Sequence, residues 1–132
     1  MILIDTNVLL DVWSSDPVWH AWSAGQMRQL SLLHQLAINP IIYAEVSVTF
    51  TTPASLDQKL SALELTVFGI PRGAAFLAGK AHVRYRRQGG IKGNVLPDFF
   101  IGAHAAALSC PLLTRDPRRY TTYFPTVSLI TP

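Results

Sequence analysis

The sequence is poor in charge and has almost no cysteine. Only 14% of its 132 residues are charged and 49% are hydrophobic, whereas typical globular domains carry about 25% charged residues. A charge-poor surface of this kind favours a domain that is partly covered by a partner. The single cysteine, Cys110, excludes an internal disulfide. Its apolar surroundings favour a buried core residue over a reactive thiol.

A basic leader and a long uncharged apolar run are also missing. The first strand-like run reaches Asp5 too soon for a signal peptide. The most apolar stretch, residues 95–113, contains Asp98, His104 and two prolines, which a membrane span would tolerate poorly. We therefore expect a soluble, cytoplasmic protein with one domain over residues 1–132. Its net charge of +3 permits a polyanionic partner without requiring one.

Short apolar runs alternate with longer amphipathic segments along the chain. The apolar runs predict strands that are buried on both faces, and alternation with helices predicts a parallel arrangement. We expect an α/β fold, a three-layer α/β/α sandwich with a mostly parallel central sheet. The predicted strands are residues 2–5, 36–39, 111–114 and 127–130, and the predicted helices are 6–13, 17–35, 41–50, 53–68, 72–88 and 97–108.

Four of the eight acidic residues are flanked by residues that should be buried. Asp5 ends the first strand, Asp116 follows the third, and Asp98 opens the last helix. Glu45 falls on the predicted apolar face of helix 41–50, with Ile41, Ala44 and Val48. For one such residue alone, a helix-dipole or turn role is an equally good explanation. For the other acids we expect a helix cap (Asp16) or a solvated surface position (Asp57 and Glu64). For Asp11 we favour a solvated position over a minor supporting role at the site.

The four acids are more informative as a group. In a parallel sheet, the carboxyl ends of strands and the amino ends of the following helices meet at the edge where ligands bind. Carboxylates that converge there raise one another's pKa unless a cation neutralises them. Oxygen ligands without His or Cys suit Mg²⁺ or Mn²⁺. We predict Asp5, Asp98 and Asp116 as metal ligands, and Glu45 as either a further ligand or the base that activates water.

The stretches MILIDTNVLLD, IIYAEV, LPDFFIGAHA and LLTRDPRRY…FPTVSLITP follow in an order and spacing that resembles the PIN domain, specifically the VapC-type toxin ribonucleases of bacterial toxin–antitoxin pairs. The resemblance covers the whole chain and implies a Mg²⁺- or Mn²⁺-dependent endoribonuclease that works as a homodimer and is blocked by a cognate antitoxin. One departure is Asn39-Pro40, where relatives commonly carry a Ser or Thr at the helix start. The residues that the resemblance assigns are Asp5, Glu45, Asp98 and Asp116 as the catalytic acids, Thr114 as a support, and Thr6 and Asn7 at the floor of the site.

Basic residues gather in the sequence near two of these acids. They could neutralise RNA phosphates, although a solubilising role beside a helix C-terminus also accounts for several of them. The predicted RNA contacts are Arg84, Arg86, Arg87, Lys92, Arg115, Arg118 and Arg119.

Two other functions stay open at this point. A haloacid-dehalogenase-like phosphatase also begins with an Asp after a strand, but it requires a second Asp where this chain has Asn7. A PIN-like module that binds RNA or a protein partner without cutting RNA is the other alternative. For His104, within IGAHAAA, placement in the core or an interface is sufficient.

Overall fold

The structure, a computed structural model, describes residues 1–91, 93 and 95–132. Within these residues, five strands form one sheet in the order β3-β2-β1-β4-β5, and every neighbouring pair is parallel. Lys92, one of the predicted RNA contacts, lies outside the described residues. The strands are β1 (Ile2–Ile4), β2 (Leu36–Ile38), β3 (Thr66–Val67), β4 (Leu112–Leu113) and β5 (Leu129–Ile130).

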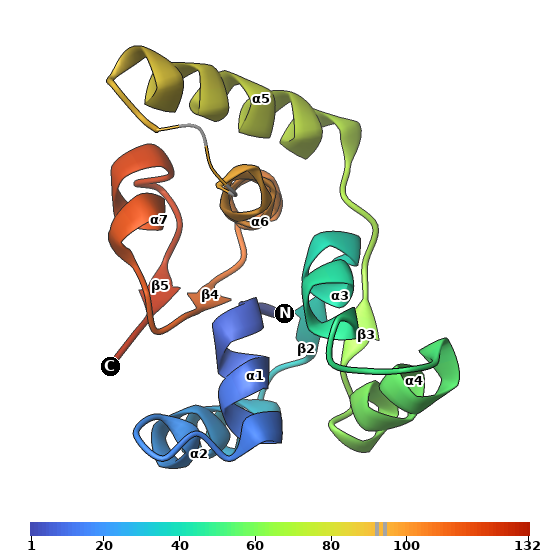
Figure 1. Ribbon diagram of the computed structural model, residues 1–132. Coiled ribbons are helices and arrows are strands. Elements are labelled where there is room, and N and C mark those ends of the chain that lie inside the picture. Colours follow the sequence, from blue (N-terminus) through green and yellow to red (C-terminus); the bar gives the residue numbers. More distant parts are fainter. Residues whose placement is uncertain (92, 94) are drawn as a thin grey trace.

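Helices cover both faces of the sheet. In Figure 1, α5 and α6 lie on one side of the strands, and α1, α2 and α4 lie on the other. This arrangement confirms the predicted α/β sandwich with a parallel central sheet. The helices are α1 (Thr6–Ser14), α2 (His20–Ser31), α3 (Pro40–Ser47), α4 (Pro53–Ala62), α5 (Arg72–Arg87), α6 (Leu96–Leu108) and α7 (Arg118–Tyr123).

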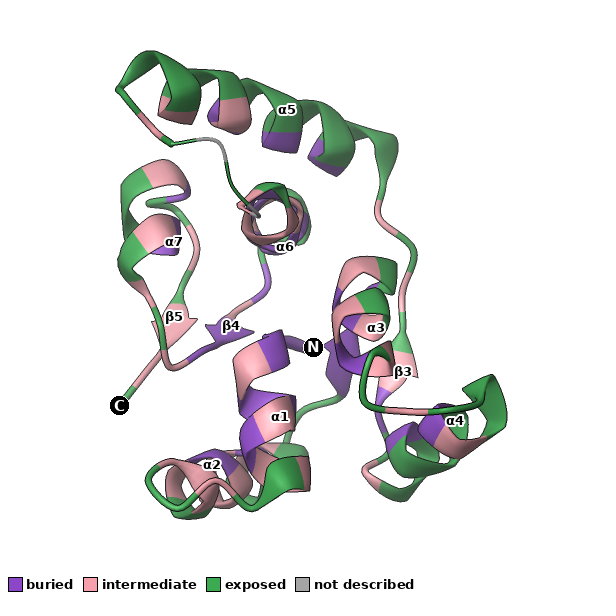
Figure 2. Ribbon diagram, in the orientation of Figure 1, coloured by how far each residue is buried: buried purple, intermediate pink, exposed green. Residues whose placement is uncertain are grey.

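The core is centred on the strands in the middle of the sheet. All residues of β1, β2 and β4 are buried, as continuous apolar strands covered on both faces should be. Figure 2 shows that the buried side of α5 faces α6, which lies between α5 and the strands. Cys110 is buried, as predicted. In the described part of the chain, no helix is long and apolar enough to span a membrane.

Three predicted elements need correction. The helix expected over 53–68 ends at Ala62, the chain turns at Glu64 with φ of 54°, and the following residues form β3. The helix expected from residue 17 begins at His20, because the Asp16 carboxylate accepts the N–H groups of Val18 and Trp19 in a separate turn. No helix was predicted at α7, which begins two residues after Asp116.

The predicted buried face of α3 is also wrong. Ile42 and Val46 are its fully buried residues, whereas Ala44 is exposed and Val48 is 82% exposed. Glu45 lies at the border between the buried and the solvent-facing sides of the helix. This position leaves its carboxylate free to reach a pocket rather than the core.

Candidate active site

The four predicted acids line a single pocket of about 540 Å³. Asp5 directly follows β1, and Asp116 follows β4, its neighbour in the sheet. Glu45 comes from α3, and Asp98 from the first turn of α6. The structure therefore brings together, at the carboxyl edge of the sheet, side chains that are far apart in the sequence. The other lining residues are Thr6, Asn7, Leu10, Arg118, Arg119, Tyr120, Thr122 and Tyr123.

Asp5 is the most buried of the four acids, with only 4% of its surface exposed. Its Oδ1 accepts the backbone N–H of Thr6 at 2.7 Å. Its Oδ2 accepts the hydroxyl groups of Thr114 at 2.8 Å and Tyr120 at 2.9 Å. Burial raises the pKa of Asp5 to about 6, although these hydrogen bonds act in the opposite direction. The carboxylate is therefore fixed in orientation but costly to ionise.

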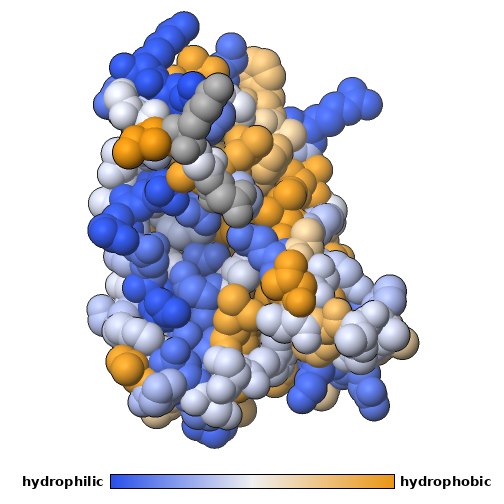
Figure 3. Space-filling model, viewed as in Figure 1, coloured by the Kyte–Doolittle hydropathy of each residue, from blue (hydrophilic) through white to orange (hydrophobic). Residues whose placement is uncertain are grey.

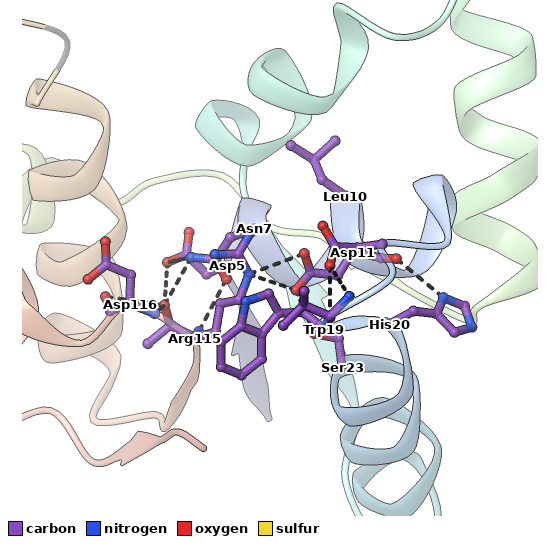
Figure 4. Close-up of polar contacts among 12 residues, drawn as sticks. Asp5, Asn7, Leu10, Asp11, Trp19, His20, Ser23, Arg115 and Asp116 are labelled. Atoms are coloured by element: carbon purple, nitrogen blue, oxygen red, sulfur yellow. Dashed lines mark hydrogen bonds and ion pairs between the residues drawn. The ribbon is translucent and has the colours of Figure 1, made fainter.

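Asn7 and Thr114 connect Asp5 to the segment that carries Asp116. The Asn7 side-chain amide donates to Asp5 Oδ2 at 3.3 Å and to Thr114 Oγ1 at 3.2 Å. Thr114 Oγ1 also accepts the backbone N–H of Asp116 at 3.1 Å. Figure 4 shows Asp5, Asn7 and Asp116 in this network. The predicted supporting residues thus lie in direct contact with the acids.

Glu45 is held by Thr6, whose hydroxyl donates to Glu45 Oε1 at 2.6 Å. Burial raises the pKa of Glu45, and the nearby Asp98 adds to the increase. The helix that carries Glu45 is capped by Asn39, whose Oδ1 accepts the N–H of Ile42 at 3.0 Å. Asn39 is therefore a working N-cap, and Pro40 fits the first turn. The departure from the usual Ser or Thr leaves the helix start intact.

Asp98 and Asp116 are each paired with an arginine of α7. Arg119 forms an ion pair with Asp98, whose pKa is nevertheless raised because its burial outweighs the arginine. Arg118 donates to the more exposed Asp116 at 3.1 Å and lowers its pKa. With Asp98 and Asp116 each turned to an arginine, the four acids are spaced apart in the pocket. Among the described residues, no three His, Cys, Asp or Glu side chains are grouped closely enough to hold a metal ion.

The chemistry of the donors still fits a hard divalent cation. All four acids and Thr6 offer oxygen, and among the described residues that line the pocket there is no His or Cys. The raised pKa values of Asp5, Glu45 and Asp98 show that negative charge is destabilised there. A bound cation would relieve that cost.

The predicted RNA contacts separate into three groups in the structure. Arg118 and Arg119 line the pocket. Arg84, Arg86 and Arg87 are exposed on the last turn of α5, and Arg84 lies over the ring of Tyr123, which also lines the pocket. Arg115 turns instead toward Asp11, with Nε 2.9 Å from Oδ2. In Figure 3, hydrophilic side chains gather over α7, and hydrophobic ones over the region between α5 and α3.

Two residues at or near the site differ from the favoured expectation. For Asp11 a solvated position was favoured over a minor supporting role, but it is only 2% exposed and pairs with Arg115 and Ser23. Tyr120, which donates to Asp5, lies on α7, where no helix was predicted. The sequence did contain one indication that Asp11 lies near the site: it is four residues after Asn7 and therefore on the same face of the helix. Nothing in the sequence pattern singled out Tyr120.

The fold and pocket define a parallel α/β protein with an acidic, oxygen-lined site at the carboxyl edge of its sheet. The PIN domain model matches residues 2–125, and the chain belongs to the PIN domain family. No curated protein matches the chain significantly.

Solved structures with this fold include bacterial complexes. A chain of VapBC2 from Rickettsia felis, bound to a DNA fragment from its promoter, is 23% identical over 100% of this chain and 99% of that chain, with a TM-score of 0.75. A chain of a toxin–antitoxin complex from Klebsiella pneumoniae is 25% identical over 100% and 98%, with a TM-score of 0.70. FitAcB from Neisseria gonorrhoeae gives 20% identity over 98% and 96%, with a TM-score of 0.67.

Proposed function

We propose that this PIN domain is a VapC-type toxin, a Mg²⁺- or Mn²⁺-dependent endoribonuclease of a type II toxin–antitoxin pair. The observation that carries the proposal is the convergence of Asp5, Glu45, Asp98 and Asp116 on one pocket with arginines at its wall. A carboxylate as buried as Asp5, with a raised pKa, costs the fold free energy when it is ionised, but it is well suited to bind a cation.

Asp5, Asp98 and Asp116 would hold the ion, and Glu45 would hold or deprotonate the attacking water. When bound, the cation would polarise the phosphoryl oxygens and make water a stronger nucleophile. Thr6 links Asp5 to Glu45, because its backbone N–H donates to Asp5 and its hydroxyl donates to Glu45. Thr114 and Tyr120 orient Asp5 from the opposite side.

RNA is the substrate that this pocket suits best. Arg118 and Arg119 lie at the acids, and exposed Arg84, Arg86 and Arg87 continue the positive surface along α5. Arginines in these positions could neutralise phosphates on both sides of the bond that is cut. When RNA and a cation are bound, Arg119 would transfer its ion pair from Asp98 to a phosphate.

The proposal includes an antitoxin, a homodimer and a cytoplasmic location. Two of the structural neighbours are described as VapBC or toxin–antitoxin complexes, which supports a protein partner. Exposed apolar side chains on α5, Phe76 at 70% and Val83 at 44%, provide surface that such contacts could cover.

The decisive experiment measures cleavage of a labelled single-stranded RNA with Mg²⁺, Mn²⁺ or EDTA. We expect cleavage with either metal, none with EDTA, and at least about a hundredfold loss in Asp5→Asn. Asp57→Asn, which changes an exposed carboxylate on α4, is the matched control and should cut normally. RNA binding without cleavage would favour the non-catalytic module. Hydrolysis of p-nitrophenyl phosphate without RNA cleavage would favour the phosphatase.

A further inference from the structure

A second polar cluster lies beside the pocket, around Asp11. This carboxylate is only 2% exposed. Its Oδ2 accepts the Ser23 hydroxyl at 2.7 Å and Arg115 Nε at 2.9 Å, and its Oδ1 accepts the same Nε at 3.1 Å. Figure 4 shows this cluster between α1 and the start of α2, next to Asp5 and Asn7. Asp11 does not line the pocket, so it has no direct contact with a substrate there.

Arg115 links this cluster to the candidate active site. It stands between Thr114, which donates to Asp5, and Asp116, a predicted metal ligand. Its backbone N–H donates to Asn7 Oδ1 at 3.2 Å, while its side chain reaches Asp11. Asn7 and Asp11 are four residues apart and therefore on the same face of α1. One face of α1 therefore holds segment 114–116 at two points: Asn7 binds the backbone N–H of Arg115, and Asp11 binds its side chain.

We infer that Asp11 and Arg115 are positioning residues, which hold segment 114–116 so that Thr114 and Asp116 stay in place around Asp5. The inference rests on the proposed function and adds to it a buried ion pair outside the pocket. It also assigns Arg115 a role other than RNA contact. Arg115 is 31% exposed, its Nε is used by Asp11, and its guanidinium lies 5.7 Å from the ring centroid of Trp19. A side chain held on two sides in this way is poorly placed to follow a flexible RNA strand.

The first test measures backbone amide exchange by NMR in EDTA, where no metal or RNA contributes. Asp11→Asn keeps the shape of the side chain but removes its charge. We expect exchange of the Arg115 and Asp116 amides to accelerate about tenfold or more relative to wild type. The Arg115 N–H donates to Asn7 on α1 and the Asp116 N–H donates to Thr114, so both bonds depend on how the segment is held against α1. The Thr114 amide, which donates to Ile130 in the sheet, should keep its protection.

The second test measures Mn²⁺ binding by calorimetry. We expect the dissociation constant to increase about tenfold in Asp11→Asn, as for other residues that orient metal ligands from outside. Leu60→Ala, in the buried face of the distant helix α4, is the control for general destabilisation and should leave Mn²⁺ affinity unchanged. If Asp11→Asn does not fold, Arg115→Gln, at the partly exposed end of the pair, replaces it.

The outcomes separate this inference from the proposed function. Wild-type exchange and Mn²⁺ affinity in both variants would overturn the inference even if the protein cuts RNA. Loss of RNA affinity in Arg115→Gln alone, with normal amide exchange, would also overturn it and make Arg115 an RNA contact. If wild type neither binds Mn²⁺ nor cuts RNA, the proposed function fails, while the exchange in EDTA still decides whether Asp11 holds the segment.

Discussion

The hydroxyl of Tyr120 donates a 2.9 Å hydrogen bond to Oδ2 of Asp5, although the two residues are 115 positions apart in the chain. Tyr120 is 2% exposed, and burial beside the carboxylates raises its own pKa well above the usual value, so it remains a donor at any physiological pH. The bond stabilises the ionised form of Asp5 against the cost of burial. Tyr120 therefore helps Asp5 to be charged when a cation is to be bound.

Tyr120→Phe should weaken Mn²⁺ binding most at low pH. Removal of one hydrogen bond to a charged group, worth roughly 1.5–3 kcal/mol, raises the pKa of Asp5 further. We expect Mn²⁺ affinity to fall about tenfold at pH 6 and much less at pH 8.5, where Asp5 is ionised in both proteins. Tyr123→Phe is the matched control, because the Tyr123 hydroxyl donates to Gln88 and not to an acid. An equal loss at both pH values would show that Tyr120 does not act through Asp5 ionisation.

The metal-free protein should lose stability as Asp5 ionises. The folded-state pKa of about 6 lies above the usual value of 3.8, so the folded state binds more protons between these pH values. The free energy of unfolding therefore falls as pH rises from about 4 to about 6, by at most about 3 kcal/mol from this residue. Asp5→Asn lacks this loss. The free energy of unfolding of Asp5→Asn, measured in urea with EDTA, should therefore increase relative to that of wild type as pH rises, and the difference should level off above about pH 7.

Asp116→Asn provides the opposite case. Arg118 lowers the pKa of Asp116 in the folded state, so its ionised form adds stability that is lost as pH falls through the folded-state value. The free energy of unfolding of Asp116→Asn should therefore fall relative to that of wild type as pH rises through the acidic range. The effect should be small, since both partners are at least half exposed. Curves of the same slope for Asp5→Asn and Asp116→Asn would contradict this assignment of the two acids.

Arg119→Gln should change metal and RNA binding in opposite directions. The variant loses the ion pair with Asp98, so that carboxylate becomes free for a cation and Mn²⁺ affinity should rise a few-fold. The variant also loses a positive charge at the pocket. When Arg119→Gln is added to the cleavage-inactive Asp5→Asn protein, RNA affinity should fall, and the slope of log affinity against log salt concentration should decrease in magnitude by about 1. Arg72→Gln, at the exposed start of α5, is the charge-matched control. A fall in both affinities would show that Arg119 supports the site rather than competes with the metal.

The sequence was sufficient for the central features of the fold. Runs such as ILI and LL are apolar at every position, as expected of strands covered on both faces, and these strands fix where Asp5 and Asp116 emerge. The acids could be grouped because a parallel sheet gathers strand ends at one edge. The pairing of Asp98 with Arg119 could not be foreseen, since it depends on how the six-residue helix α7 packs against α6.

The errors have causes that lie outside the neighbouring sequence. The two residues of β3 have no periodicity of their own, and they become a strand only because β2 offers its edge. A solvated position was favoured for Asp11 because its side chain is charged, but its burial is made possible by Arg115, more than a hundred residues away. A charge that is neutralised by a distant residue leaves no trace in its own neighbourhood.

Asn39→Ala should destabilise the protein more than loss of an ordinary helix cap. Asn39 is fully buried; besides capping α3, its amide lies 3.1 Å from Nδ1 of the buried His104, whose pKa is lowered by burial. Among the described residues, His104 Nε2 has no hydrogen-bond partner, so loss of Asn39 leaves the ring without any. We expect a loss of about 2–4 kcal/mol in urea unfolding, the sum of a cap and a buried contact.

Two further variants separate these contributions. Asn39→Ser retains a capping oxygen but cannot reach the ring as Asn39 does, so it should recover about 1 kcal/mol of the loss. Thr52→Ala removes the exposed cap of α4, whose hydroxyl accepts the Ser55 N–H, and should cost only about 0.5–1 kcal/mol. Because α3 carries Glu45 and α6 carries both His104 and Asp98, the contact between Asn39 and His104 also joins the two helices that bring acids to the pocket. If Asn39→Ala cost no more than Thr52→Ala, His104 would contribute nothing to the placement of α3.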